Sequence, residues 1–221
     1  MRSSKRYIVT LSLASFVASL LIGLLVYLLV KSEGPFSITA NPVNGIKICI
    51  TAGCVHCLLN LILFYVYAPN SFESGFRIVN VAKCCCLLVF ACFTFHAIAV
   101  CFGAPLVKSA TETFHFAMLL TVLVCLPFCL LSGPSIESWF EVFIEKSSHI
   151  GLETVVYFTS MGALLGSWLG AIPIPLDWDR PWQEWPISCV VGAVGGYSLG
   201  LLLSAVYLPR KYSMLHKSKF F

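Results

Sequence analysis

The sequence predicts an all-α integral membrane protein with six transmembrane helices, and three observations carry this prediction. Of its 221 residues, 58% are hydrophobic. Only 11% are charged, against about a quarter in an ordinary soluble domain. The charges also avoid six apolar runs, each near the roughly 20 residues that a helix needs to cross a bilayer. The runs cover residues 8–30, 48–67, 84–102, 113–132, 154–172 and 186–208. Backbone polar groups inside a bilayer must pair within the chain, so each run is expected to be helical and the whole chain to form one polytopic domain.

The first two runs are expected to remain in the membrane as spans. The run 8–30 is longer than the core of a signal peptide, which usually has about 7–15 apolar residues, and no small-x-small cleavage pattern follows it. The run 48–67 carries His56 and, one turn later, Asn60. Polar side chains inside a membrane are candidates for function, although a hydrogen bond between helices is the simpler alternative.

The third run contains His96 and much of a cysteine-rich segment. The chain has 11 cysteines, nearly all within the apolar runs. Cys54 and Cys57 have the spacing of a redox motif, but they lie near mid-membrane without thioredoxin-like surroundings. Buried cysteine packs as a small apolar residue, which is the interpretation that we favour for the set. S-palmitoylation of cysteines 84–86, beside Lys83, is the alternative.

Glu112 directly precedes the fourth run, and His115 lies near its start. The longest loop, residues 133–153, follows this run. Glutamates recur in this loop every four residues, at Glu137, Glu141 and Glu145. Residues with this spacing share one face of a helix. The sequence therefore predicts a short amphipathic helix on the membrane surface between the fourth and fifth spans. Docking of this helix on a protein partner is the alternative.

The last two runs each carry a glycine ladder, in which glycines recur at every fourth residue. The ladders are Gly162, Gly166 and Gly170 in the fifth run and Gly192, Gly196 and Gly200 in the sixth. Small residues let helix backbones approach closely in a bilayer, where no hydrophobic force drives helices together. Each ladder is expected to pack either against the other ladder or against a helix of another protein.

The segment that joins these two runs, residues 172–186, is called the cap here. Its four prolines restrict the unfolded chain, and its three tryptophans suit the headgroup layer of a membrane. The candidate contact residues of the cap are Asp177, Trp178, Asp179, Arg180, Trp182, Glu184 and Trp185. A metal site needs more ligands, and phosphoryl transfer needs a positioned nucleophile. We therefore expect the cap to contact a partner or lipid headgroups, and we expect no metal or cofactor.

The basic residues are distributed unevenly between the two sides of the predicted bundle. Of the 14 Lys and Arg residues, ten fall on the side shared by the two termini and four on the side of the cap. The positive-inside rule then places the termini in the cytosol and the cap on the lumenal or exterior side. In the tail KSKFF, Lys217 and Lys219 have a spacing similar to the dilysine signal that returns membrane proteins to the endoplasmic reticulum. A basic tail that binds anionic lipid is the alternative.

The loops are too short to hold a separate catalytic domain, because a chain below roughly 40 residues rarely builds a core unaided. No Asp or Glu lies in any of the apolar runs, which disfavours a proton-coupled carrier. The net charge of +4 is not gathered into a basic stripe, which excludes a nucleic-acid-binding role. The helices and the short segments at their ends must carry the function.

Three overlapping or neighbouring stretches carry a family resemblance. They are CFTFHAIAVCFGAP (92–105), GAPLVKSATETFHFA (103–117) and, above all, GSWLGAIPIPLDWDRPWQEWPISC (166–189). These stretches resemble the phosphatidylinositol-glycan biosynthesis class F (PIG-F) family. The resemblance extends from Lys83 onward and leaves out the first two runs and the KSKFF tail.

The resemblance implies a multi-pass protein of the endoplasmic reticulum membrane that serves the assembly of glycosylphosphatidylinositol (GPI) anchors. It implies a non-catalytic subunit that stabilises two alternative ethanolamine-phosphate transferases, which modify the second and third mannoses of the glycan. We expect the ladders and the cap to pack against helices of the transferase, and the cap to orient the glycolipid. A stand-alone lipid-handling protein, either a flippase or a small transferase, is the alternative. It would use His56, Asn60, His96, Glu112 and His115.

Overall fold

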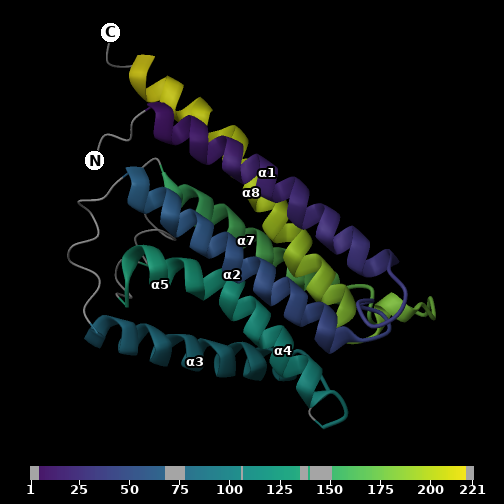
Figure 1. Cartoon of the computed structure of the whole chain (residues 1–221). Coiled ribbons are helices and arrows are strands. Elements are labelled where there is room, and N and C mark those ends of the chain that lie inside the picture. Colours follow the sequence, from purple (N-terminus) through teal and green to yellow (C-terminus); the bar gives the residue numbers. More distant parts are fainter. Residues whose placement is uncertain (1–4, 68–77, 106, 135–138, 140–150, 218–221) are drawn as a thin grey trace.

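The computed structural model describes residues 5–67, 78–105, 107–134, 139 and 151–217. Within these residues, six helical spans are long and apolar enough to cross a membrane, as the sequence predicts. The spans run up and down between two ends of an elongated bundle (Figure 1). We call the end where α1 begins and α8 ends the terminal end, and the opposite end the cap end. The placement of the terminal end in the cytosol stays a prediction from the distribution of Lys and Arg.

The spans are built from seven α-helices and one π-helical turn among the described residues. The α-helices are α1 (Lys5–Lys31), α2 (Pro42–Tyr67), α3 (Ile78–Cys101), α4 (Ala110–Leu120), α5 (Leu126–Ser132), α7 (Leu152–Ala171) and α8 (Ile187–Lys217). The π-helical turn η2 (Thr121–Cys125) joins α4 to α5 in one span. It ends two residues before Pro127, whose nitrogen cannot donate a backbone hydrogen bond. A single wide turn of this kind is a usual way to accommodate an interruption in a helix.

Three helices extend well beyond the apolar runs that predicted them, and one of these is α3, which begins at Ile78 and includes Lys83. α2 begins at Pro42 and includes Lys47, and α8 continues through Pro209 and Arg210 to Lys217. A charge ends an apolar run without ending a helix, because the long side chains of Lys and Arg can reach the headgroup layer. The helix predicted between the fourth and fifth spans, with Glu137, Glu141 and Glu145, lies outside the described residues. Trp139 is described, and its Nε1 donates to the Gly133 carbonyl at 3.2 Å.

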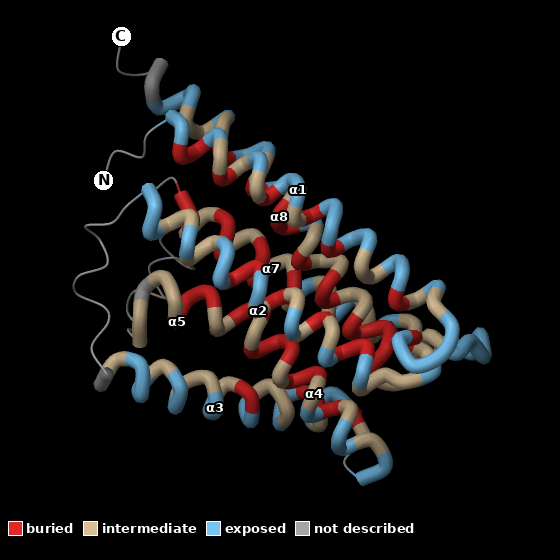
Figure 2. Tube along the Cα trace, in the orientation of Figure 1, coloured by how far each residue is buried: buried red, intermediate tan, exposed pale blue. Residues whose placement is uncertain are grey.

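The core of the bundle lies around the fourth span and the pair formed by α7 and α8. Among the six spans, the one made of α4, η2 and α5 is the most buried and α3 is the least buried. α7 and α8 make the most extensive contact of any two described elements. α1 packs mainly on α8, and α3 packs mainly on α4 and η2, so α1 and α3 lie at opposite edges of the bundle (Figures 1 and 2).

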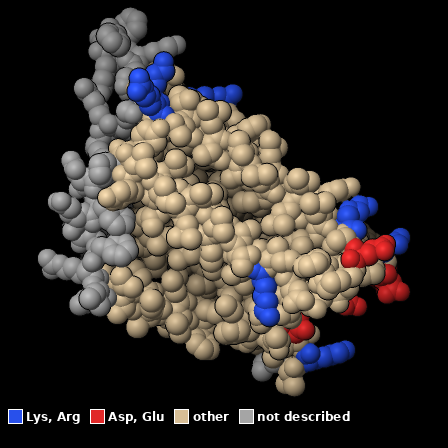
Figure 3. All heavy atoms as spheres, viewed as in Figure 1, with Lys and Arg blue, Asp and Glu red and all other residues tan. Residues whose placement is uncertain are grey.

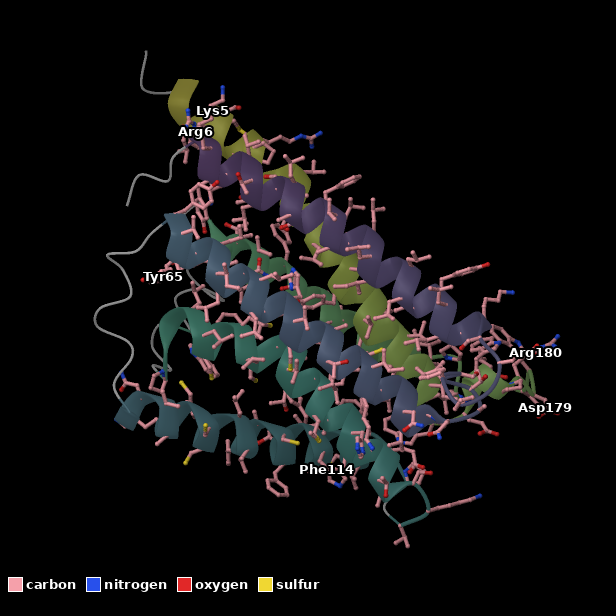
Figure 4. The ribbon with its side chains drawn as sticks, in the orientation of Figure 1. Lys5, Arg6, Tyr65, Phe114, Asp179 and Arg180 are labelled. Atoms are coloured by element: carbon pink, nitrogen blue, oxygen red, sulfur yellow. The ribbon has the colours of Figure 1, made fainter. Side chains whose placement is uncertain are left out.

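The charged side chains lie mainly toward the two ends of the bundle. On the face drawn in Figure 3, acidic side chains gather at the cap end, and the broad middle is largely free of charge. Lys5 and Arg6 lie at the terminal end, whereas Asp179 and Arg180 lie at the cap end (Figure 4). Such a surface suits a protein whose middle is surrounded by lipid.

Candidate partner interface

The two glycine ladders face each other across the contact between α7 and α8. A methyl group placed on Gly166 would overlap the carbonyl oxygen of Gly192, and one on Gly196 would overlap the carbonyl oxygen of Gly162. The obstructing atoms belong to the backbone, so they cannot move aside as a side chain would. The remaining ladder glycines, Gly170 and Gly200, meet the carbonyl oxygens of Ser188 and Phe158 in the same way. The occupant of each ladder is therefore the neighbouring helix of the same chain, which leaves no room there for a helix of another protein.

The cap is organised around one buried polar side chain, that of Gln183. Its Nε2 donates to the carbonyl oxygens of Pro173 and Leu176, both at 2.8 Å. Its Oε1 accepts the backbone N–H of Arg180 at 2.9 Å, at the start of the short 3-10 helix η3 (Pro181–Gln183). These three bonds fix both halves of the cap to each other. The cap is thus a fixed structure at the end of the bundle.

Trp185 joins the cap to the central span. Its Nε1 donates to the Thr113 hydroxyl of α4 at 2.8 Å, and the hydroxyl in turn donates to the Ser109 carbonyl at 2.8 Å. The ring of Trp185 also meets the ring of Phe116 edge-on, with centroids 5.5 Å apart. The cap therefore keeps its position relative to α4 as well as to α7 and α8.

The outer side of the cap presents the charged residues that the sequence singled out. Exposed residues there are Asp177, Trp178, Asp179, Arg180 and Glu184, whereas Trp182 and Trp185 are half-buried. The rings of Trp178 and Trp182 pack edge-on, with centroids 6.0 Å apart. Asp179 and Arg180 project from the cap end of the molecule in Figure 4. A rigid segment with exposed charges and an exposed tryptophan suits contact with another surface.

An exposed apolar stripe runs along α7 toward the cap. It consists of Leu165, Trp168, Leu169 and Ile172, which follow one another at the spacing of a single helix face. Leu176 and Trp178 of the cap are also exposed beyond its end. The stripe lies on the same helix as one glycine ladder but does not belong to the contact with α8, because its side chains are exposed. We call these four residues the α7 stripe.

The intramembrane polar residues of α2 reach a tyrosine that the sequence did not single out. The Tyr197 hydroxyl of α8 and His56 Nδ1 lie 2.7 Å apart, and Asn60 Nδ2 lies 3.2 Å from His56 Nε2. Thr159 of α7 lies beside this group. A cavity of about 20 Å³ adjoins these four side chains, which is room for about one water molecule. The group therefore ties α2 to α8 through the hydrogen bond between His56 and Tyr197.

The other candidate polar residues do not join this group. His96 lies on α3, where its Nδ1 is buried and has no hydrogen-bond partner among the described residues. His115 Nδ1 donates to the Thr111 carbonyl of its own helix at 2.8 Å, and Glu112 lies in the first turn of that helix. In the part of the chain that the structure describes, no three His, Cys, Asp or Glu side chains converge in a way that could hold a metal ion. Lys217 is the last residue of α8, and Lys219 lies outside the described residues.

Comparison with known proteins now decides the family. The model of the GPI biosynthesis protein family Pig-F matches residues 5–205. The chain belongs to this Pig-F family. The matched range includes α1 and α2, which the resemblance read from the sequence did not cover.

Relatives in this family carry names that describe their role. The human protein named "GPI ethanolamine phosphate transferase, stabilizing subunit" is 40% identical over 165 residues, which cover 73% of this chain and 75% of that protein. The mouse protein of the same name is 38% identical over the same length. A Yarrowia lipolytica protein named "Glycosylphosphatidylinositol anchor biosynthesis protein 11" is 37% identical over 135 residues, or 60% of this chain and 57% of that protein. No solved structure matches the chain.

The structure also identifies a contact of this Pig-F chain that sequence reasoning missed. The Ser19 hydroxyl of α1 donates to the Ser198 carbonyl of α8, and the Ser198 hydroxyl donates to the Ser19 carbonyl, both at 2.9 Å. A methyl group on Gly23 would lie 3.7 Å from the Ser198 hydroxyl. A signal was present, because Ser15, Ser19 and Gly23 form a third ladder of small residues at four-residue spacing. Gln183 and Tyr197 had no comparable signal.

Proposed function

We propose that this chain is a non-catalytic, stabilising subunit of GPI ethanolamine phosphate transferase in the endoplasmic reticulum membrane. The observation that supports this proposal most strongly is its 40% identity to the human stabilizing subunit over about three quarters of both chains. Two alternative catalytic subunits are the proposed partners, as the resemblance read from the sequence implies.

The α7 stripe and the outer side of the cap form the proposed partner surface. The glycine ladders are not part of this partner surface, because each ladder is covered by the other helix of the α7–α8 pair. A membrane helix of the transferase would cover the α7 stripe, and a part of the transferase outside the bilayer would meet the charged residues of the cap. The stripe continues directly toward the cap, so one partner can contact both at once. The glycolipid would be oriented at the same surface.

Binding of this kind stabilises a partner through mass action. A subunit that binds only the folded transferase adds about 2.7 kcal/mol to its stability when the free subunit is present at 100 times the dissociation constant. This stabilisation requires no chemistry from the bound chain. It does require an interface that is already ordered before binding, and the hydrogen bonds of Gln183 and Trp185 provide such order in the cap.

A co-purification experiment tests the proposed surface. Trp168→Ala in the α7 stripe should greatly reduce recovery of the transferase with the tagged chain. Tryptophans at the centre of an interface typically contribute about 2 kcal/mol or more, which corresponds to a loss of affinity of about thirtyfold or more.

Tyr27→Ala on α1 is the matched control for Trp168→Ala. Tyr27 is 59% exposed and Trp168 is 60% exposed, and both lie in the last turn or two of their helices at the cap end. Tyr27→Ala should leave recovery of the transferase unchanged. Equal recovery with both variants would exclude the α7 stripe from the interface, while recovery of no transferase with the unaltered chain would contradict the proposed function itself.

The alternative of a stand-alone lipid-handling protein has less support. The residues that it would use are divided among α2, α3 and α4. The cavity beside His56 holds about one water molecule, far less than a lipid headgroup. If this alternative held, the purified chain in liposomes would move or modify a phospholipid with no partner present.

A further inference from the structure

The start of α3 carries three consecutive cysteines at the expected edge of the hydrocarbon layer. Lys83 is exposed and directly precedes the apolar run 84–102, which carries no charge. At 1.5 Å per residue, that run is about 28 Å long, which matches the roughly 30 Å thickness of the hydrocarbon core. Lys83 therefore marks the headgroup boundary, and Cys84, Cys85 and Cys86 lie just inside it. α3 begins at the terminal end of the bundle (Figure 1), which the Lys and Arg distribution assigns to the cytosol.

The three thiols have different surroundings. Cys84 is half-buried, and its Sγ lies 3.8 Å from the Cys129 carbonyl of α5. Cys85 and Cys86 are exposed. Val89 and Phe90, one turn further along from each of them, are also exposed. A chain attached to Cys85 or Cys86 could therefore lie along the outside of α3 and point into the bilayer.

We propose that Cys85 and Cys86 are S-acylation sites that take long-chain fatty acyl groups from acyl-coenzyme A. The cysteine sulfur attacks the thioester carbonyl, forming a new carbon–sulfur bond while the bond to coenzyme A breaks. The proton of the cysteine thiol ends on the coenzyme A thiol. The exchange replaces one thioester by another, so it needs no oxidant or reductant. Exposed cysteines at the cytosolic boundary of a membrane span are the usual acceptors of such groups.

The acyl groups would anchor the least buried span of the bundle. α3 contacts mainly α4 and η2, so little of its surface is held by the protein. An acyl chain at its first turns inside the bilayer adds apolar surface at the point where the helix enters the membrane. This inference does not depend on the proposed role in GPI biosynthesis.

Thioester-specific mass tagging of the full-length chain tests the proposal. Free thiols are first blocked, the thioesters are cleaved with hydroxylamine, and the released thiols are labelled with a polyethylene-glycol maleimide of known mass. We expect two tags on the unaltered chain, one on Cys85→Ser or Cys86→Ser, and none on the double variant. Peptide mass spectrometry of the unaltered chain should find the acyl groups on the same two residues, and this measurement requires no variant.

Two cysteines of the same helix serve as controls. Cys101 is exposed like Cys85 and Cys86 but lies at the cap end of α3. Cys84 lies beside them but is held against α5. Cys101→Ser and Cys84→Ser should each keep two tags. An untagged chain, tags that persist in the double variant, or tags lost with Cys101→Ser would each overturn the proposal.

Discussion

Two adjacent glycines of α8, Gly195 and Gly196, have opposite surroundings. A methyl group on Gly196 would overlap backbone atoms of Gly162, whereas nothing lies within 4 Å of a methyl group on Gly195. We expect Gly196→Ala to lower the free energy of unfolding by about 1–3 kcal/mol, since α7 and α8 must separate to admit the methyl group. Gly195→Ala should be neutral or stabilising by up to about 1 kcal/mol, because alanine favours helix.

Thermal unfolding of both variants in detergent micelles separates these two outcomes. The two substitutions add the same methyl group to the same helix, so their difference reports the contact between the ladders alone. Equal unfolding midpoints would show that the ladders do not face each other.

A second prediction concerns the hydrogen bond between His56 and Tyr197. Tyr197→Phe keeps the ring but removes the hydroxyl, which leaves the buried His56 Nδ1 without its 2.7 Å partner. We expect a loss of about 1–2 kcal/mol in the free energy of unfolding. Tyr207→Phe is the control, because Tyr207 lies on the same helix but is exposed. It should change the unfolding midpoint little. Similar losses for both variants would contradict a special role for the buried pair.

His56 and Asn60 were identifiable from the sequence because polar residues stand out in an apolar run. Their partner was not, because Tyr197 is 141 residues away along the chain. The glycine ladders were equally visible, but the sequence left open whether a second ladder or a partner helix fills them. Periodicity shows which face of a helix carries small side chains. Only the packed structure shows which helix lies against that face.

At the scale of elements, the cap depends on the amide group of Gln183. Gln183→Glu conserves size but replaces a donor by an acceptor that faces the Pro173 and Leu176 carbonyls. We expect the cap to lose about 2–3 kcal/mol of local stability, since two hydrogen bonds are replaced by repulsion. Hydrogen–deuterium exchange of residues 172–186 should therefore become faster.

Glu184→Gln makes the reverse change at the exposed neighbouring position. It should leave exchange in the cap at the rate of the unaltered chain. If Gln183→Glu exchanged no faster than this control, the buried amide would not be what holds the cap together.

The number and order of the spans could be predicted from uncharged length, but the helix ends could not. The runs located all six spans, yet α2 and α8 continue past Lys47 and Pro209 into charged sequence. The turn η2 was also missed, because the residues of this wide backbone turn are as apolar as the helices on either side of it. The prolines and tryptophans of the cap indicated a restricted segment at the headgroup layer, but the sequence did not indicate that Gln183 is buried at its centre.

At the scale of the molecule, the packing order of the helices lay beyond the sequence. In a bilayer, faces turned to lipid and faces turned to protein are both apolar, so periodicity cannot distinguish them. The structure places α1 and α3 at opposite edges and the fourth span in the centre. Exposed apolar side chains also lie along α1, α2 and α3. We assign the partner to the α7 stripe because it continues into the exposed outer side of the cap.

The lifetime of the transferase tests the central claim most directly. Pulse-chase labelling would measure the half-life of GPI ethanolamine phosphate transferase in cells that lack this chain and in the same cells after the chain is restored. A stabilising subunit predicts a short half-life without the chain and a several-fold longer one with it. An identical half-life in both cells would contradict the account.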